Sequence, residues 1–132
     1  MAHRTFTLAE ANAALERVRP LAAAMVEHHR ALAVARRMQA RIVTRIAGNG
    51  GGMEPSELAE SRATAERESR DLARCIHGLQ EIGVQVKGID EGLVDFPSLR
   101  DGAEVLLCWR LGEDEIRFWH GTDEGFAARK PL

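Results

Sequence analysis

The feature that most constrains the fold is a glycine-rich run at residues 48–52, GNGGG, which separates two long stretches of helical periodicity. Apolar residues recur at alternating spacings of four and three over residues 21–47 and again over residues 54–82. Glycines end helices and make turns. Because the two stretches match in length and their link is short, the sequence predicts an antiparallel helical hairpin of roughly 40 Å.

The two helices of this hairpin are each predicted to present one apolar seam to the other. The seam residues are Leu21, Met25, His28, Leu32, Ala35, Gln39 or Met38, Ile42 and Ile46 on the first helix, and Leu58, Ser61, Ala65, Glu68, Leu72, Cys75, Leu79 and Ile82 on the second.

The helical part begins at a capping box. Thr7 is a candidate N-cap, and Glu10 follows three residues later. Phe6, just before the cap, is expected to pack against Ala11. Pro20 removes one helical hydrogen bond, so the sequence predicts either a kink in one long helix or a break with a new helix starting at Pro20.

The C-terminal half reads as an antiparallel meander. Residues 84–89 and 93–96 form two short predicted strands, the second ended by Pro97, and residues 98–102 form a polar connection. Residues 104–120, EVLLCWRLGEDEIRFWH, then alternate with period two as a pair of strands. A turn at Gly112-Glu113, of the type that begins with glycine, places Arg110 opposite Glu115; a turn one residue later shifts each pairing.

Both faces of this strand pair carry large side chains. In the predicted register Trp109 faces Ile116 and Leu107 faces Phe118, so Trp109 and Trp119 project from opposite faces. A sheet open to water on one side normally has a polar face. We therefore expect helices to cover one face and a second subunit or the chain ends to cover the other, with one tryptophan in the core and the other at an interface or pocket.

The predicted class is α+β, a long helical hairpin with a kinked N-terminal helix followed by a small antiparallel meander of three to four strands. Residues 1–132 are expected to form a single domain, with a helical part at 7–82, the meander at 83–120 and a tail at 121–132. Phe126 of that tail is expected to enter the core.

Composition excludes several functional classes. The formal net charge is -2, with acids and bases interspersed, which argues against nucleic-acid binding. No apolar run reaches the roughly 20 residues that a membrane span requires, and the N-terminus has no secretory signal. Cys75 and Cys108 have neither metal-site nor disulfide-framework spacing, so we expect a cytoplasmic protein without membrane contact.

The first candidate site lies on the meander and consists of His120, Asp95, Arg100, Arg117 and Asp123. A carboxylate near an imidazole suits acid–base work, and guanidinium groups suit an anionic ligand. The alternative is that these side chains neutralise one another, Asp95 with Arg100 or Arg117. No residue is assigned a catalytic role, because no spacing matches a catalytic motif.

A second candidate lies in the hairpin, where His28 and Cys75 fall on facing seams. With Glu27, His29 or His77 they suggest a soft-metal or haem site. An ordinary core histidine beside a buried thiol explains the pattern better, because two ligands do not make a closed site. We therefore predict no metal and no cofactor.

Two further features read as ordinary structure. The glycine run resembles a phosphate-binding turn, but no Lys-Ser/Thr follows it, so it is interpreted as a loop. The first helix is rich in arginine, and acids on the second helix offer partners, which is typical of a solvated surface. The aromatic residues typical of RNA binding are absent from this pattern. The arginines are Arg30, Arg36, Arg37, Arg41 and Arg45.

Three segments carry a resemblance to a known family. The segments FTLAEANAAL, GVQVKGIDEGLVDFPSLRDGAEVLLCWRLGEDEIRFWH and GFAARKPL resemble the bacterial domain-of-unknown-function 2203 family, over essentially the full chain. The resemblance implies a compact bacterial protein. This family carries no established activity, so no catalytic residue is transferred.

Two functions are compatible with these observations. The first is a non-enzymatic interaction module that forms a homodimer or binds a protein partner, which the absence of catalytic spacing favours. The second is a small enzyme, or a sensor of a ligand or metal, built around His120, Asp95, Arg100 and Arg117.

Overall fold

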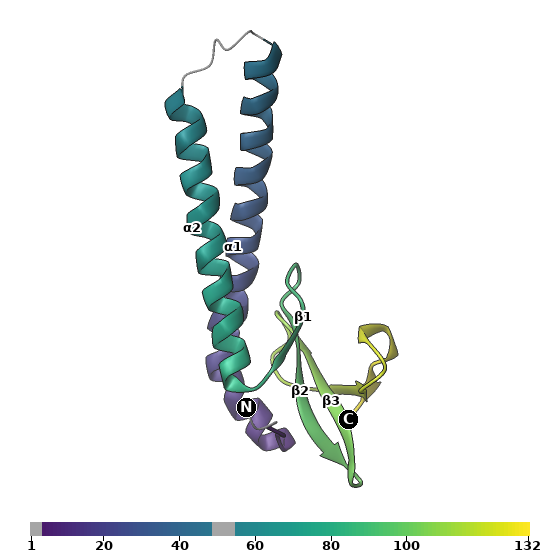
Figure 1. Cartoon of the computed structure of the whole chain (residues 1–132). Coiled ribbons are helices and arrows are strands. Elements are labelled where there is room, and N and C mark those ends of the chain that lie inside the picture. The colour runs from purple at the N-terminus through teal and green to yellow at the C-terminus, as the bar shows by residue number, and fades with distance from the viewer. Residues whose placement is uncertain (1–3, 49–54) are drawn as a thin grey trace.

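The computed structural model describes residues 4–48 and 55–132, and within them a helical hairpin is followed by an antiparallel sheet (Figure 1). The helices are α1 (Leu8–Gly48) and α2 (Pro55–Ile82). The strands, adjacent in the sheet in chain order, are β1 (Gln85–Gly88), β2 (Leu93–Arg100), β3 (Ala103–Arg110), β4 (Phe118–Gly121) and β5 (Lys130–Pro131), and a 3-10 helix, η1 (Phe126–Ala128), precedes β5. The predicted α+β class is confirmed. The strand β5 was missed because a two-residue strand shows no periodicity.

The helix α1 starts at the predicted capping box. The Thr7 N–H donates to Glu10 Oε1 at 2.8 Å, and the Glu10 N–H donates to Thr7 Oγ1 at 3.1 Å. These bonds lower the pKa of Glu10. Phe6 and Ala11 are both buried in the core, as the predicted staple requires.

Replacing Thr7 by alanine is expected to lower the free energy of unfolding by about 1 kcal/mol, because one orphan N–H of the first turn loses its acceptor. Thermal or urea denaturation followed by circular dichroism measures this loss. Replacing Thr5, which lies just outside the box and is exposed, is the control and should change the stability little. Equal stability of the Thr7 variant and wild type would show that the box contributes nothing.

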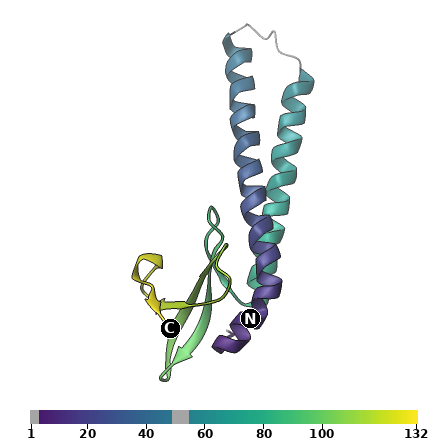
Figure 2. The same ribbon diagram turned by 180° about the vertical axis from the view of Figure 1, so that it is seen from behind.

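Pro20 does not break the helix. It lies inside α1, on an exposed position, and α1 continues through it to Gly48. A new helix starting at Pro20 is therefore wrong. Figures 1 and 2 show the first turns of α1 inclined to the rest of the helix, in keeping with the predicted kink.

The two helices lie antiparallel, as predicted, and their seams meet in the core. Near the sheet the contact is fully buried, and it includes Leu15, Met25 and Leu79. Further along, α1 still buries Leu32 and Ile42 against α2. Residues 49–54, which hold most of the glycine run, lie outside the described residues, so the loop predicted there stays a prediction. Neither described helix has an apolar stretch long enough to cross a bilayer.

The strand β2 continues through Pro97 instead of ending there. Pro97 pairs with Leu106 of β3, while β1 pairs only with the first part of β2, up to Asp95. Beyond Asp95, β2 has no partner strand on its β1 side, and proline is tolerated at such a free edge. At this edge the Phe6 N–H donates to the Pro97 carbonyl at 2.7 Å. The predicted polar connection is in fact a two-residue turn, in which Asp101 (φ 52°) and Gly102 (φ 80°) supply the positive φ angles of a tight hairpin.

The predicted register of β3 and β4 is wrong by one residue. Leu107 pairs with Trp119, and Cys108 pairs with Phe118. The strands β3 and β4 are joined by residues 111–117 and not by a two-residue turn. Contacts with the core hold this longer connection in place. The Trp109 indole N–H donates to the Glu113 carbonyl at 2.9 Å, and the Ile116 N–H donates to Asn12 Oδ1 of α1 at 2.9 Å.

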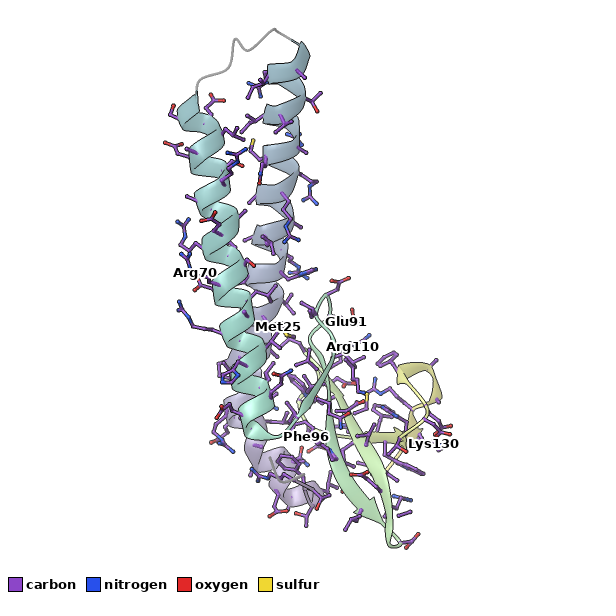
Figure 3. The ribbon with its side chains drawn as sticks, in the orientation of Figure 1. Met25, Arg70, Glu91, Phe96, Arg110 and Lys130 are labelled. Carbon is purple, nitrogen blue, oxygen red and sulfur yellow. The ribbon has the colours of Figure 1, made fainter. Side chains whose placement is uncertain are left out.

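A one-residue shift moves side chains to the other face of a sheet. Trp109 and Trp119 therefore share one face, contrary to the prediction, although Trp109 is in the core and Trp119 is only partly buried, as expected. This face packs on the helices through Val94, Phe96, Leu107 and Trp109. Figure 3 shows Met25 and Phe96 where the hairpin meets the sheet.

The chain end covers the other face of the sheet. The segment from η1 to β5 lies on the side away from the helices (Figure 2), and the Arg129 guanidinium stacks over the Phe118 ring at 4.0 Å. The same arginine pairs with Glu113 at 2.7 Å. Phe126 does not enter the core, contrary to the prediction, but remains 38% exposed between Arg110 and Arg129. Of the two covers predicted for this face, a second subunit or the chain end, the structure shows the chain end.

Candidate functional site

A cluster of three polar side chains lies buried on the tail-covered face of the sheet. Asp95 comes from β2, Cys108 from β3 and His120 from β4. Their exposed fractions are 1%, 0% and 1%. Asp95 and Cys108 are direct partners in the β2–β3 ladder, and His120 pairs with Leu106, two residues from Cys108 along β3 and on the same face. The observed register brings His120 to this face.

Two hydrogen bonds of the His120 ring indicate its tautomer. Its Nδ1 lies 2.8 Å from the Gly121 carbonyl, which can only accept, so Nδ1 carries a hydrogen. Its Nε2 lies 3.1 Å from Asp95 Oδ2. One proton is therefore shared between Nε2 and the carboxylate. The other oxygen, Asp95 Oδ1, is buried and has no hydrogen-bond partner among residues 4–48 and 55–132.

Burial dominates the electrostatics of this cluster. Desolvation raises the pKa of Asp95, and the charge of His120 opposes that rise. Burial, together with the negative charge of Asp95, raises the pKa of Cys108 to about 12. The thiol is therefore uncharged at neutral pH.

The structure does not gather the other predicted site residues around His120. The Arg100 guanidinium stacks over Trp119 at 4.6 Å, on the helix-facing side. Arg117 is exposed and pairs with Asp114 at 3.7 Å and with Glu115 at 3.3 Å. Neither arginine pairs with Asp95 in the described part of the chain.

The remaining predicted partners also differ from the prediction. Asp123 lies exposed in the turn after β4. The predicted pair of Arg110 with Glu115 is replaced by stacking of Arg110 over Phe126 at 5.1 Å. Cys108 was missed as a member of the cluster. Counting back along both strands from the Asp101-Gly102 turn would have placed it opposite Asp95.

The hairpin cluster forms with a different partner from the one predicted. His28 Nδ1 lies 2.6 Å from Glu68 Oε2, and Asp71 is the third nearby ligand-type side chain. Cys75 is buried in the core beside them along α2. The other two histidines point away as expected: His29 pairs with Asp90 at 2.7 Å, and His77 with Glu81 at 3.0 Å.

A cavity of about 390 Å³ lies between the N-terminal segment and the end of the sheet. Its wall includes residues 5–8, Arg100, Trp119 and Leu132. The second tryptophan was predicted to lie at an interface or in a pocket, and Trp119 does line a pocket. Lys130 also stacks on its ring at 4.6 Å, so two cations flank this wall.

The part of the hairpin that extends beyond the sheet is here called the distal arm (residues 31–48 and 55–70; Figures 1 and 2). An apolar groove runs along it. This groove has a volume of about 380 Å³ and is lined by Ala31, Val34, Ala35, Met38, Ser61 and Thr64. A second hollow continues it toward the tip and shares Met38, Ser61 and Thr64 with it. Val34 is 54% exposed and Met38 is 45% exposed.

These features define a class of α+β protein in which a helical hairpin extends beyond a meander that encloses a buried Asp–Cys–His cluster. A family model described as an uncharacterized conserved protein (DUF2203) matches residues 4–132, so the chain belongs to this family, as the resemblance predicted. Comparisons with curated proteins and with solved structures gave no match.

Proposed function

We propose that this protein is a non-enzymatic interaction module that forms a homodimer through its distal arm. The observation that carries this proposal is the apolar groove with Val34 and Met38 exposed beside it. Two helices alone leave both sides of their contact open to water. Packing two such pairs together gives a four-helix bundle, in which these side chains are buried.

The sheet reaches only the near end of this surface, where Asp90 and Val34 border one hollow. The turn between β1 and β2 reaches α1 at the ion pair of His29 with Asp90, at 2.7 Å, and Figure 1 shows the hairpin continuing beyond that point. Another groove between the same helices is charged, since Arg36, Glu66 and Arg70 line it. Figure 3 shows Arg70 pointing outward from α2. The apolar side is therefore the side suited to a partner helix.

Charge complementarity favours a second copy of this chain as the partner. Residues 30–45 of α1 contain five arginines and no acid. The second hollow, which continues the groove toward the tip, carries Glu57 and Glu60 on its α2 side. In a two-fold arrangement with each α1 against the partner's α2, the basic helix meets the acidic edge twice.

A cytoplasmic location is part of the proposal. Cys75 and Cys108 are both free and buried, in keeping with a reducing compartment. A cell fractionation that found the protein outside the cytoplasm would contradict this location.

Val34→Glu is expected to weaken the dimer by at least about 10-fold, because it places a charge in the apolar interface. Val43→Glu is the matched control. It is the same substitution on the same helix at a side chain that is 48% exposed, and nine residues at 100° each place it on the opposite side of α1. Analytical ultracentrifugation over a concentration series measures both dissociation constants.

Two results would contradict the homodimer. One is a wild-type protein that sediments as a monomer at every concentration. The other is equal weakening by Val34→Glu and Val43→Glu, which would place the interface elsewhere. Circular dichroism shows whether each variant keeps its helices.

A further inference from the structure

We infer that Asp95, Cys108 and His120 form a binding site for one zinc ion. Imidazole, thiolate and carboxylate are the protein ligands of zinc. Their ligand atoms already lie within 4.8 Å of one another, each from a different strand. Zinc bond lengths place tetrahedral ligand atoms about 3.3–3.6 Å apart, and His120 Nε2 is 3.1 Å from Asp95 Oδ2. Small side-chain rotations would complete the arrangement.

The unpartnered oxygen of Asp95 is an independent observation in favour of a cation. Oδ2 bonds to His120, whereas Oδ1 is buried without a hydrogen bond of ordinary geometry in the described ranges. The Cys108 thiol is nevertheless close enough to the carboxyl to lower its pKa. Leaving a buried acceptor unsatisfied costs free energy, and buried charges are normally paired or bound to metal. A metal ion bound to this carboxylate would remove that cost.

The orientation of His120 is the one found in metal-ligating histidines. Such a histidine donates its other ring N–H to a carbonyl or carboxylate, which fixes the tautomer. Here Nδ1 donates to the Gly121 carbonyl at 2.8 Å. Nε2 is thereby directed at Asp95 and Cys108 with its lone pair available once the shared proton leaves.

The charges of the site balance with and without zinc. Before binding, the thiol is neutral, and Asp95 and His120 share one proton, so the cluster has no net charge. Zinc binding releases the thiol proton and the shared proton, and the ion then balances one thiolate and one carboxylate. Two described cations act on the cluster: Lys87 lowers the pKa of Asp95, and Arg129, which is itself paired with Glu113 at 2.7 Å, lowers the pKa of Cys108.

The donor set selects zinc over the common hard cations. Magnesium and calcium prefer oxygen ligands, whereas thiolate and imidazole together favour zinc. The site is enclosed between three strands and the C-terminal segment. Three protein ligands leave the fourth tetrahedral position of the ion open to water. Because the three ligands come from β2, β3 and β4, we assign the ion the role of holding these strands together.

The test uses the full chain, stripped of metal with a chelator and then titrated with Co²⁺, which reports thiolate ligation through a charge-transfer absorption. Wild type is expected to show this band and to bind one Zn²⁺ in competition, with a raised melting temperature. Cys108→Ser should abolish the band and weaken Zn²⁺ binding by more than about 100-fold, the largest loss expected from a residue that only supports a ligand.

Cys75→Ser is the matched control, because Cys75 is the other buried free thiol and lies in α2. It should leave both the band and the affinity unchanged. The inference is overturned if folded wild type gives no thiolate band, or if Cys75→Ser removes the band as Cys108→Ser does. It is also overturned if His28→Ala, at the other cluster of ligand-type side chains, abolishes zinc binding. The wild-type titration decides the question even if Cys108→Ser fails to fold.

Discussion

Replacing His120 by leucine is expected to lower the free energy of unfolding of the metal-free protein by about 3–5 kcal/mol, the usual cost of removing one partner of a buried ion pair. Asp95 is 1% exposed, and its Oδ2 would lose the imidazole 3.1 Å away. Its Oδ1 already lacks a partner among the described residues. Urea denaturation in the presence of a chelator, followed by circular dichroism, measures the loss.

The double variant Asp95→Val/His120→Leu separates this electrostatic cost from a simple packing defect. It replaces both members of the pair by apolar side chains that suit strands, and such replacements are often neutral or stabilising. We expect the double variant to be more stable than His120→Leu alone, although it loses more native polar groups. If the second substitution instead adds to the loss, the imidazole does not compensate the Asp95 charge.

Replacing Trp109 by alanine is expected to cost about 3–5 kcal/mol, as large-to-small substitutions of buried aromatic residues do. Trp109 is fully buried between the sheet and α1. Its indole N–H also holds the Glu113 carbonyl at 2.9 Å, so the loop that precedes β4 loses an anchor. The midpoint and slope of urea denaturation measure the change.

Trp119→Ala is the control for this prediction. Trp119 lies on the same face of the sheet but is only partly buried, with cations on its ring. Its loss should cost about 1–2 kcal/mol, for partial burial and the cation–π contacts. Comparable losses from the two substitutions would mean that Trp119 is as important to the core as Trp109.

The helical part was predictable because its signals are local. A capping box at Thr7 and Glu10 involves four consecutive residues, and the facing seams follow from spacing within each helix. The same local reasoning left open a helix break at Pro20. The helix continues there, because packing offsets the one hydrogen bond that the proline removes. Local reasoning also left Met38 as an alternative seam position, whereas this side chain is exposed beside the groove.

The candidate site was only partly predictable. Asp95 and His120 were selected as polar residues near apolar strands, and the structure joins them by a hydrogen bond. Their partners were not foreseen, because opposite charges in the sequence suggested arginines. Arg100, at the end of β2, instead stacks over Trp119 of β4, and Arg117, in the connection before β4, pairs with Asp114 and Glu115. Cys108 is brought in by ladder pairing across β2 and β3.

Local patterns were enough to predict the two helices, the longer alternating strands and the need to cover both faces of the sheet. The register of β3 and β4 depends on tertiary contacts, because the loop at residues 111–117 is fixed by contacts with α1 and Trp109. That register decides the face on which His120 lies. The buried cluster of Asp95, Cys108 and His120 exists because residues far apart in the chain pair across strands, and local patterns carry no information about such distances.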